Sequence, residues 1–137
     1  MALTHVVDTS VLKRLGAPGV RSVVEPLARA GRVARTTISD LEVAYSARNT
    51  HEWESLMAGL TAFDSLDTTA GHVARALQVQ RLLAGRNQRG RKIPDLLIAA
   101  AAEEQDLTVL HYDGDFDLIA AVTGQRTEWV VPSGSID

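Results

Sequence analysis

Near its start the chain reads Leu3-Thr4-His5-Val6-Val7-Asp8, a short apolar run with β-branched residues that ends on an acid. Such a run predicts a buried strand over Leu3–Val7 that begins almost at the first residue. Four later segments have the same character and are predicted to be strands as well: Val33–Thr37, Phe63–Leu66, Thr108–His111 and Trp129–Val131.

Apolar residues with helical spacing occupy the segments between these strands. The predicted helices cover Val20–Ala30, Ser39–Ala47, Glu52–Leu60, Thr69–Ala84 and Pro94–Gln105, and the last is apolar on nearly all sides, which indicates a buried helix. Strands that alternate with helices imply crossover connections. We therefore expect an α/β fold, with a mainly parallel sheet of four to five strands and helices on both faces. No linker or repeat interrupts the chain, so residues 1–137 are expected to form one domain.

The composition limits the possible functions. The 137 residues are 45% hydrophobic and 23% charged, with a formal net charge of −3, so no overall basic field indicates a nucleic-acid-binding protein. The absence of cysteine excludes disulfides and thiolate metal sites. The first residues lack the pattern of a signal peptide, and the longest apolar run, Leu96–Ala102, is too short to span a bilayer. A soluble, cytoplasmic protein is the expectation.

Acidic residues follow two of the predicted strands and begin two of the predicted helices. Asp8 comes directly after the first strand, and Asp113 and Asp115 follow the strand Thr108–His111. Since the carboxyl ends of parallel strands meet at one edge of a sheet, these side chains are expected there together. Glu42 and Asp95 lie in the first turns of helices that start where loops leave the same edge. Five carboxylates are thus predicted to converge.

Each acid also has a simpler interpretation. Asp8 is equally explained as a helix N-cap, and Ser39-Asp40-Leu41-Glu42 matches a capping box. Asp95 follows Pro94, so its charge suits the first turn of a helix, and Asp113-Gly114 is typical of a turn. These interpretations explain the acids singly but not why several would gather at one edge.

Clustered carboxylates repel one another unless a cation neutralises them. Hard divalent ions prefer carboxylate and water oxygens, whereas zinc would also require histidine or cysteine. The four histidines show no metal-ligand spacing. Mg²⁺ is therefore the first choice of cofactor, with Mn²⁺ as the alternative.

Four segments in this order resemble the pattern of PIN-domain ribonucleases, and in particular the VapC-like toxins of toxin–antitoxin pairs. The segments are Val6-Val7-Asp8-Thr9-Ser10, Glu42 on an early helix, Ile93-Pro94-Asp95-Leu96-Leu97-Ile98-Ala99-Ala100, and Leu110-His111-Tyr112-Asp113-Gly114-Asp115-Phe116. The resemblance covers essentially the whole chain. One departure is His111, where many members of the family carry a small hydroxyl residue.

The resemblance implies an endoribonuclease whose acids line a Mg²⁺ site, supported through hydrogen bonds by Thr9 or Ser10. It also implies inhibition by a VapB-like antitoxin that places a basic side chain in the acidic pocket, and a homodimer. For the hydrolysis of a phosphodiester by metal-activated water, we predict Asp8 and Asp95 as principal ligands. Glu42 and Asp115 would bind a second ion or metal-bound waters, and Asp113 would support the ligands.

A basic loop precedes the third segment and carries Arg86, Arg89, Arg91 and Lys92 beside Asp95. Arginine and lysine bind RNA phosphates, so this loop is a candidate RNA-binding element, although a solvated loop explains it about equally well. Two other functions stay open at this point. One is a PIN-like DNA nuclease and the other a PIN scaffold that binds without catalysis.

Overall fold

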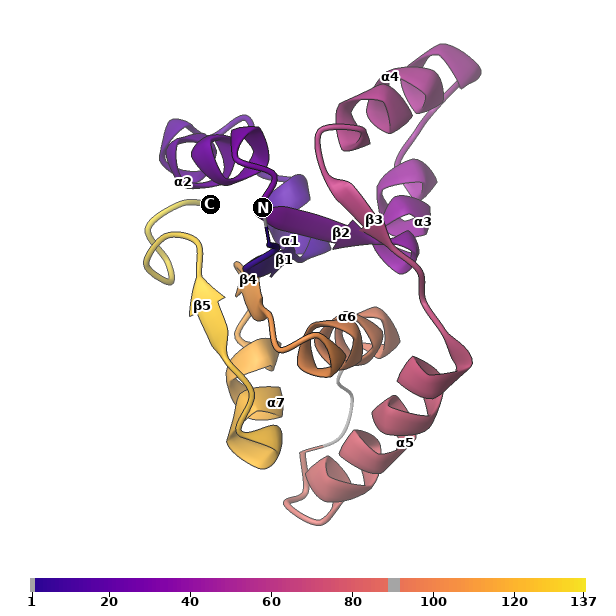
Figure 1. The fold of residues 1–137 in the computed structure, drawn as a ribbon, viewed down its shortest axis with the longest axis vertical. Helices are drawn as coiled ribbons and strands as arrows, with labels where there is room; N and C mark the ends of the chain where they lie inside the picture. Colours follow the sequence, from indigo (N-terminus) through magenta and orange to yellow (C-terminus); the bar gives the residue numbers. More distant parts are fainter. Residues whose placement is uncertain (1, 89–91) are drawn as a thin grey trace.

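A parallel sheet forms the centre of the molecule (Figure 1). The computed structural model of the chain describes residues 2–88 and 92–137. In this part the five strands are β1 (His5–Val7), β2 (Val33–Thr36), β3 (Asp64–Leu66), β4 (Thr108–His111) and β5 (Thr127–Trp129). They pair in the order β3-β2-β1-β4-β5, and every pairing is parallel. The predicted α/β fold with a parallel sheet is confirmed.

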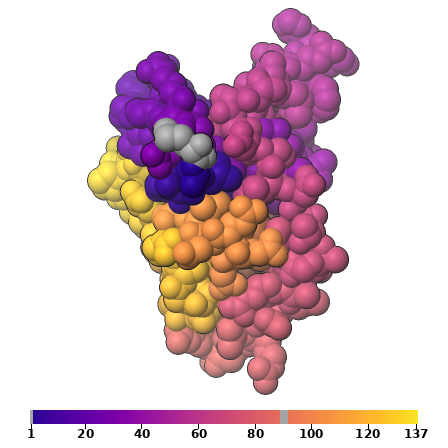
Figure 2. Space-filling model, in the orientation of Figure 1, coloured from indigo at the N-terminus to yellow at the C-terminus, as the bar shows by residue number. Residues whose placement is uncertain are grey.

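Helices connect the strands and cover the sheet on both faces (Figure 1). In the described residues they are α1 (Thr9–Leu12), α2 (Pro18–Arg29), α3 (Thr37–Tyr45), α4 (Thr50–Leu60), α5 (Ala70–Ala84), α6 (Ile93–Glu104) and α7 (Asp115–Thr123). Figure 2 shows that the segment containing α4 projects from the body of the molecule. No helix in these described ranges is both long and apolar enough to cross a membrane.

Successive side chains along each strand point to opposite faces of the sheet, and a separate hydrophobic core forms on each face. Val6 packs on one face with residues of α5, α6 and α7, whereas its neighbour Val7 packs on the other face with residues of α1 and α2. Val109 and Leu110 on β4 divide in the same way. This pattern follows from the two-residue period of a strand, and all four side chains are fully buried.

Helix α6 is buried on nearly all sides, as its sequence predicts. Every residue from Leu96 to Ala102 is buried, and α6 contacts α5, α7 and the central strands. Two polar links fasten α5 to α6: His72 Nε2 lies 3.1 Å from Glu104 Oε1, and Arg75 donates two hydrogen bonds to Glu103. These contacts fasten the last two residues of α6 to α5.

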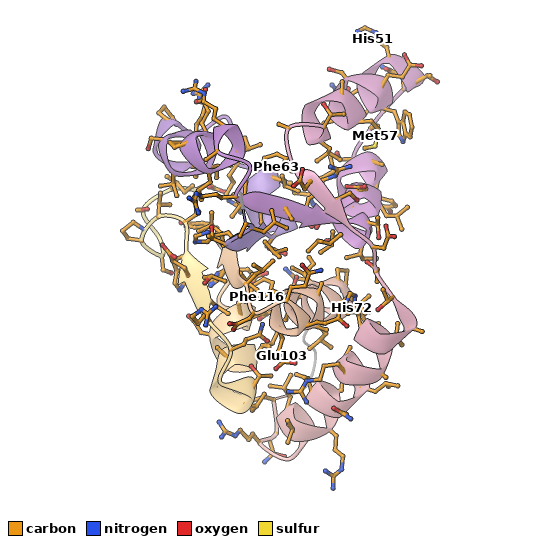
Figure 3. The ribbon with its side chains drawn as sticks, in the orientation of Figure 1. His51, Met57, Phe63, His72, Glu103 and Phe116 are labelled. Atoms are coloured by element: carbon orange, nitrogen blue, oxygen red, sulfur yellow. The ribbon has the colours of Figure 1, made fainter. Side chains whose placement is uncertain are left out.

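Several elements differ from the sequence-based expectations, among them α7, β5 and α3. Helix α7 was not predicted as an element, and it packs Phe116 into the core (Figure 3). Strand β5 begins at Thr127, two residues before the predicted start, because Thr127 and Glu128 pair with Val109 and Leu110 of β4. Helix α3 begins at Thr37 and is capped by Thr36.

Candidate active site

A cavity of about 240 Å³ opens at the carboxyl edge of the sheet, where β1 and β4 end. Its lining combines acids with hydroxyl and basic residues: Asp8, Thr9, Ser10, Lys13, Arg14, Glu42, Lys92, Asp95, Tyr112 and Asp113. Asp115 does not line this cavity, but one of its carboxylate oxygens lies within 4.8 Å of oxygens of Asp95 and Asp113. The structure thus brings all five predicted acids together.

Asp8 directly follows β1, and its two carboxylate oxygens have different surroundings. Asp8 Oδ2 accepts hydrogen bonds from the backbone N–H of Ser10 at 3.0 Å and from the Ser10 hydroxyl at 2.5 Å, so Asp8 does cap α1. Asp8 Oδ1 is buried and has no hydrogen-bond partner within the described ranges. Burial is the main reason that the pKa of Asp8 is raised, although the bonds from Ser10 oppose this shift. Capping and a place in the cavity are therefore compatible.

Glu42 faces the cavity from α3. The Thr9 hydroxyl donates to Glu42 Oε1 at 2.6 Å and lies 2.9 Å from Ser39 Oγ, which joins α1 to α3. Because α3 starts at Thr37, Ser39 is inside the helix and is not its N-cap, so the capping-box interpretation of Glu42 is wrong.

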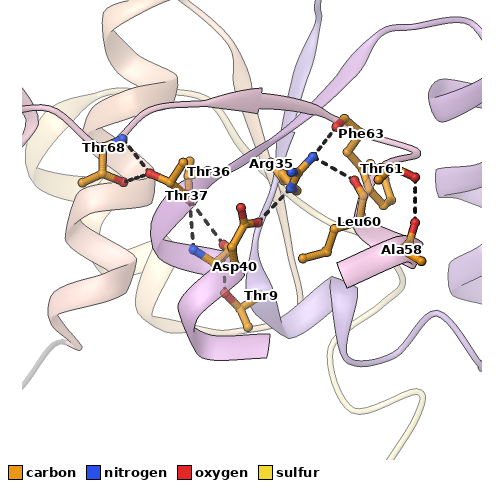
Figure 4. A network of polar contacts seen from close by, with 11 residues as sticks. Thr9, Arg35, Thr36, Thr37, Asp40, Ala58, Leu60, Thr61, Phe63 and Thr68 are labelled. Carbon is orange, nitrogen blue, oxygen red and sulfur yellow. Dashed lines mark hydrogen bonds and ion pairs between the residues drawn. The ribbon is translucent and has the colours of Figure 1, made fainter. Parts of the chain in front are cut away.

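A polar network holds α3 against the sheet (Figure 4). Arg35 on β2 donates to Asp40 Oδ1 at 2.8 Å, to the Leu60 carbonyl at 2.8 Å and to the Phe63 carbonyl. Thr37 accepts a 2.9 Å hydrogen bond from the backbone N–H of Thr68. These bonds set the position of α3, and with it the position of Glu42.

Asp95 lies in the first turn of α6, one residue after Pro94, and is only 4% exposed. Asp95 Oδ2 finds no hydrogen-bond partner in residues 2–88 and 92–137. Burial, together with the nearby charges of Asp8 and Asp113, raises the pKa of Asp95 to about 8. An acid with such a pKa holds a proton at neutral pH unless a cation takes the place of that proton.

Asp113 is held in the turn that follows β4. Its Oδ1 accepts from the backbone N–H of Asp115 at 3.0 Å, and its Oδ2 lies 2.9 Å from Lys92 Nζ. Burial alone would raise the pKa of Asp113, but the Asp115 N–H and the Lys92 ammonium outweigh it and lower the pKa. The same hydrogen bond with Asp113 raises the pKa of Lys92. Asp113 therefore carries its negative charge more readily than a free aspartate does.

His111 is fully buried and supports that turn. Its Nδ1 accepts a 3.2 Å hydrogen bond from the backbone N–H of Asp113, and its ring stacks on Phe116 at 5.0 Å. Burial lowers the pKa of His111 to about 4, so the ring is neutral at physiological pH. His111 thus occupies a buried position at the end of β4.

The predicted basic loop is only partly at the cavity. Lys92 lines it, whereas Arg86 is exposed beyond the end of α5 and does not. Arg89 and Arg91 lie outside the described residues. Sequence analysis missed two other cations, Lys13 and Arg14, which line the cavity directly. Their signal is a basic pair one helical turn after the Asp8 cap.

The donor set fits a hard divalent cation. Two buried carboxylate oxygens, Asp8 Oδ1 and Asp95 Oδ2, lack partners within the part of the chain that the structure describes, although buried polar atoms are normally hydrogen-bonded. Three further acids stand beside them, and no histidine lines the cavity. Carboxylate oxygens without imidazole nitrogen suit Mg²⁺ or Mn²⁺ rather than zinc.

Comparison with known proteins agrees with this geometry. The sequence profile of the PIN domain matches residues 5–122. Ribonuclease VapC51 of Mycobacterium tuberculosis is 68% identical over 137 residues, which is the full length of both chains. Ribonuclease VapC21 of the same organism is 39% identical and covers 98% of this chain and 99% of its own.

Solved structures share the fold. One is the VapBC2 complex of Rickettsia felis bound to a promoter DNA fragment, with a TM-score of 0.77 and 17% identity, covering 94% of this chain and 99% of that one. Another is VapBC-5 of Mycobacterium tuberculosis, with a TM-score of 0.62 and 28% identity, covering 93% and 95%. The fold is that of a PIN domain. The chain belongs to the PIN-domain family and, within it, to the VapC group.

Proposed function

We propose that this protein is an endoribonuclease that hydrolyses RNA phosphodiester bonds with the help of a bound divalent cation, with Mg²⁺ as the first choice and Mn²⁺ as the alternative. The observation that carries the proposal is a pair of buried carboxylate oxygens, on Asp8 and Asp95, that have no hydrogen-bond partner among the described residues and are set among three further acids. Helix capping uses only Asp8 Oδ2 and leaves both of these oxygens without a role.

Asp8 and Asp95 would hold the cation directly. Glu42 and Asp115 would hold a second ion or its waters, with Asp113 supporting them. When bound, such a cation lowers the pKa of a water molecule and shields the charge that develops on the phosphate. Ser10 orients Asp8 through two hydrogen bonds, and the Thr9 hydroxyl orients Glu42 through one. Lys92, which pairs with Asp113, would attract the RNA backbone.

The biological setting is part of the same proposal. The relatives VapC51 and VapC21 are named ribonucleases, and several structural neighbours are described as toxin–antitoxin complexes. We propose that this chain is likewise the toxin of a pair in the cytoplasm. A VapB-like antitoxin would inhibit it by placing a basic side chain among the acids, and the toxin would form a homodimer. Charge complementarity supports the inhibitory contact, because more acidic than basic residues line the cavity.

The decisive experiment compares cleavage of matched RNA and DNA oligomers by the purified chain, in Mg²⁺ and in EDTA. We expect cleavage of RNA only, dependent on the metal, and a loss of at least about a hundredfold in Asp8→Asn and Asp95→Asn. Asp106→Asn is the matched control, since Asp106 is exposed and does not line this cavity. Cleavage of DNA would instead support the DNA nuclease, and no cleavage in any metal would support a non-catalytic binding module.

A further inference from the structure

Arg14 is a cation of the cavity that the metal-site proposal does not use. It follows α1 and lines the cavity together with Asp8 and Lys92, with 28% of its side chain exposed. Its Nη1 donates to the Ser10 carbonyl at 2.8 Å, and the guanidinium carbon lies 5.0 Å from the centre of the Tyr112 ring. These contacts hold the guanidinium in place, so little conformational entropy is lost when it binds an anion.

The other edge of this guanidinium faces the carboxylate of Asp137. Arg14 Nε lies 3.3 Å from Asp137 Oδ1, and Nη2 lies 3.2 Å from Oδ2, so the pair has two parallel contacts. Tyr112 holds the backbone beside Asp137. Its hydroxyl donates to the Ile136 carbonyl at 2.6 Å and accepts from the N–H groups of Gly134 and Ile136. The segment after β5, yellow in Figure 1, therefore ends against a residue of the cavity wall.

The partners of Arg14 differ from those of Arg35, the arginine that holds α3. Arg35 bonds two backbone carbonyls and the part-buried Asp40, which makes it a structural residue. Arg14 bonds one carbonyl, and its acidic partner Asp137 is 63% exposed. An exposed ion pair contributes little stability and is easily replaced. A phosphate accepts two parallel hydrogen bonds from a guanidinium just as a carboxylate does.

We infer that Arg14 binds a backbone phosphate of the RNA substrate, and that Asp137 occupies this phosphate position until RNA displaces it. The inference rests on the proposed function, because it assigns a substrate contact to the same cavity. It makes Arg14 a substrate-binding residue and Asp137 an internal competitor for its guanidinium.

The test measures binding of a fluorescent single-stranded RNA oligomer by anisotropy in Mg²⁺, with every variant made in an Asp95→Asn background so that the RNA is not consumed. Arg14→Gln is expected to bind about tenfold more weakly, the loss of a charge-assisted contact. Its plot of log affinity against log salt should be shallower by about 0.7, the value for one phosphate contact on a single strand. The RNA affinity of Arg14→Lys should lie between those of the Asp95→Asn parent and Arg14→Gln, because lysine keeps the charge without the planar fork.

Asp137→Asn is expected to bind RNA about two to five times more tightly, as expected when a weak exposed ion pair is removed. This gain should vanish when Arg14→Gln is also present, because the two changes then act on one contact. The matched control is the remote exposed pair Arg126–Asp106, where Arg126→Gln and Asp106→Asn make the same charge changes. Both controls should bind as the Asp95→Asn parent does. Thermal melting of each variant confirms that it is folded.

Three outcomes would overturn the inference: unchanged RNA affinity in folded Arg14→Gln, an Asp137→Asn gain that persists without Arg14, or an equal gain in Asp106→Asn. Unchanged affinity in Arg14→Gln would show that Arg14 does not contact the RNA. Either of the other two outcomes would show that Asp137→Asn acts only through the net charge of the protein. Failure of the proposed function is separate, since it would appear as the absence of metal-dependent RNA cleavage by the wild-type chain. Cleavage with unchanged Arg14→Gln binding would reject this inference alone.

Discussion

Asp95 is the residue whose charge depends most on what surrounds it. Its side chain is buried beside Asp8 and Asp113, and these conditions raise its pKa from 3.8 to about 8. In the metal-free protein the folded state therefore holds a proton that the unfolded state has already released at neutral pH. This proton links the stability of the fold to pH.

The sign of that linkage gives the first prediction. A raised pKa contributes stability that is complete below about pH 4 and is lost as the pH rises through about 8. In EDTA, the free energy of unfolding should fall from pH 5 to pH 8 by at most about 1.4 kcal/mol per pH unit for each proton. Asp95→Asn should flatten this dependence. Urea unfolding at each pH measures it, and a wild-type profile as flat as that of the variant would contradict the raised pKa.

The Thr9 hydroxyl bonds to Glu42 and also contacts the Ser39 hydroxyl. The isosteric change Thr9→Val removes the 2.6 Å hydrogen bond to Glu42 Oε1 while keeping the shape of the side chain. We expect affinity for Mg²⁺ to fall about tenfold, as is usual when a residue that orients a metal ligand is lost. The free energy of unfolding should fall by about 1 kcal/mol. Isothermal titration gives the affinity. Thr61→Val, which loses only a bond to the Ala58 carbonyl, should leave it unchanged.

Among the elements, α6 has the strongest sequence signal and the site depends on it most. Its all-apolar run from Leu96 to Ala102 predicts burial on every side, and the structure agrees. The same helix places Asp95 in its first turn, facing the ends of β1 and β4. Packing of the body of α6 therefore determines where an acid of the site lies.

A core truncation in α6 should be far more costly than one on an exposed helix face. Ile98 is 0% exposed, so Ile98→Ala is expected to lower the free energy of unfolding by about 3 kcal/mol. Leu77→Ala on α5 is the matched control, because Leu77 is 62% exposed, and it should cost less than about 0.5 kcal/mol. Urea unfolding measures both. Equal costs would show that α6 is not held by its core contacts.

Sequence reasoning missed helix α1, and the reason is physical. Helix α1 spans only Thr9–Leu12, a single turn, so it has no periodicity to detect, and the cavity residues Lys13 and Arg14 were missed with it. In contrast, Asp8 and Asp113 were predicted to meet because parallel strands end at one edge, which does not depend on side-chain detail. The spacing of Ser39 and Glu42 was misleading, since its capping-box pattern falls inside α3 by coincidence.

At the scale of the whole molecule, the acids come from segments that only the complete fold brings together. Asp8, Glu42, Asp95 and Asp113 are spread over more than a hundred residues, yet they line one cavity because β1, α3, α6 and the end of β4 meet there. The unfolded chain has no such arrangement. A cation that binds the assembled acids therefore binds the native state and not the unfolded state.

This difference predicts that Mg²⁺ stabilises the protein against heat. A ligand present at a hundred times its Kd and bound only by the native state adds about 2.7 kcal/mol to the free energy of unfolding. For a chain of this size that amount corresponds to a rise in melting temperature of roughly 10 °C. EDTA should reverse the rise, and Asp8→Asn should remove most of it, whereas Asp106→Asn should keep it. Calorimetry over a Mg²⁺ series tests this, and an equal rise in Asp8→Asn would mean that the ion binds elsewhere on the protein.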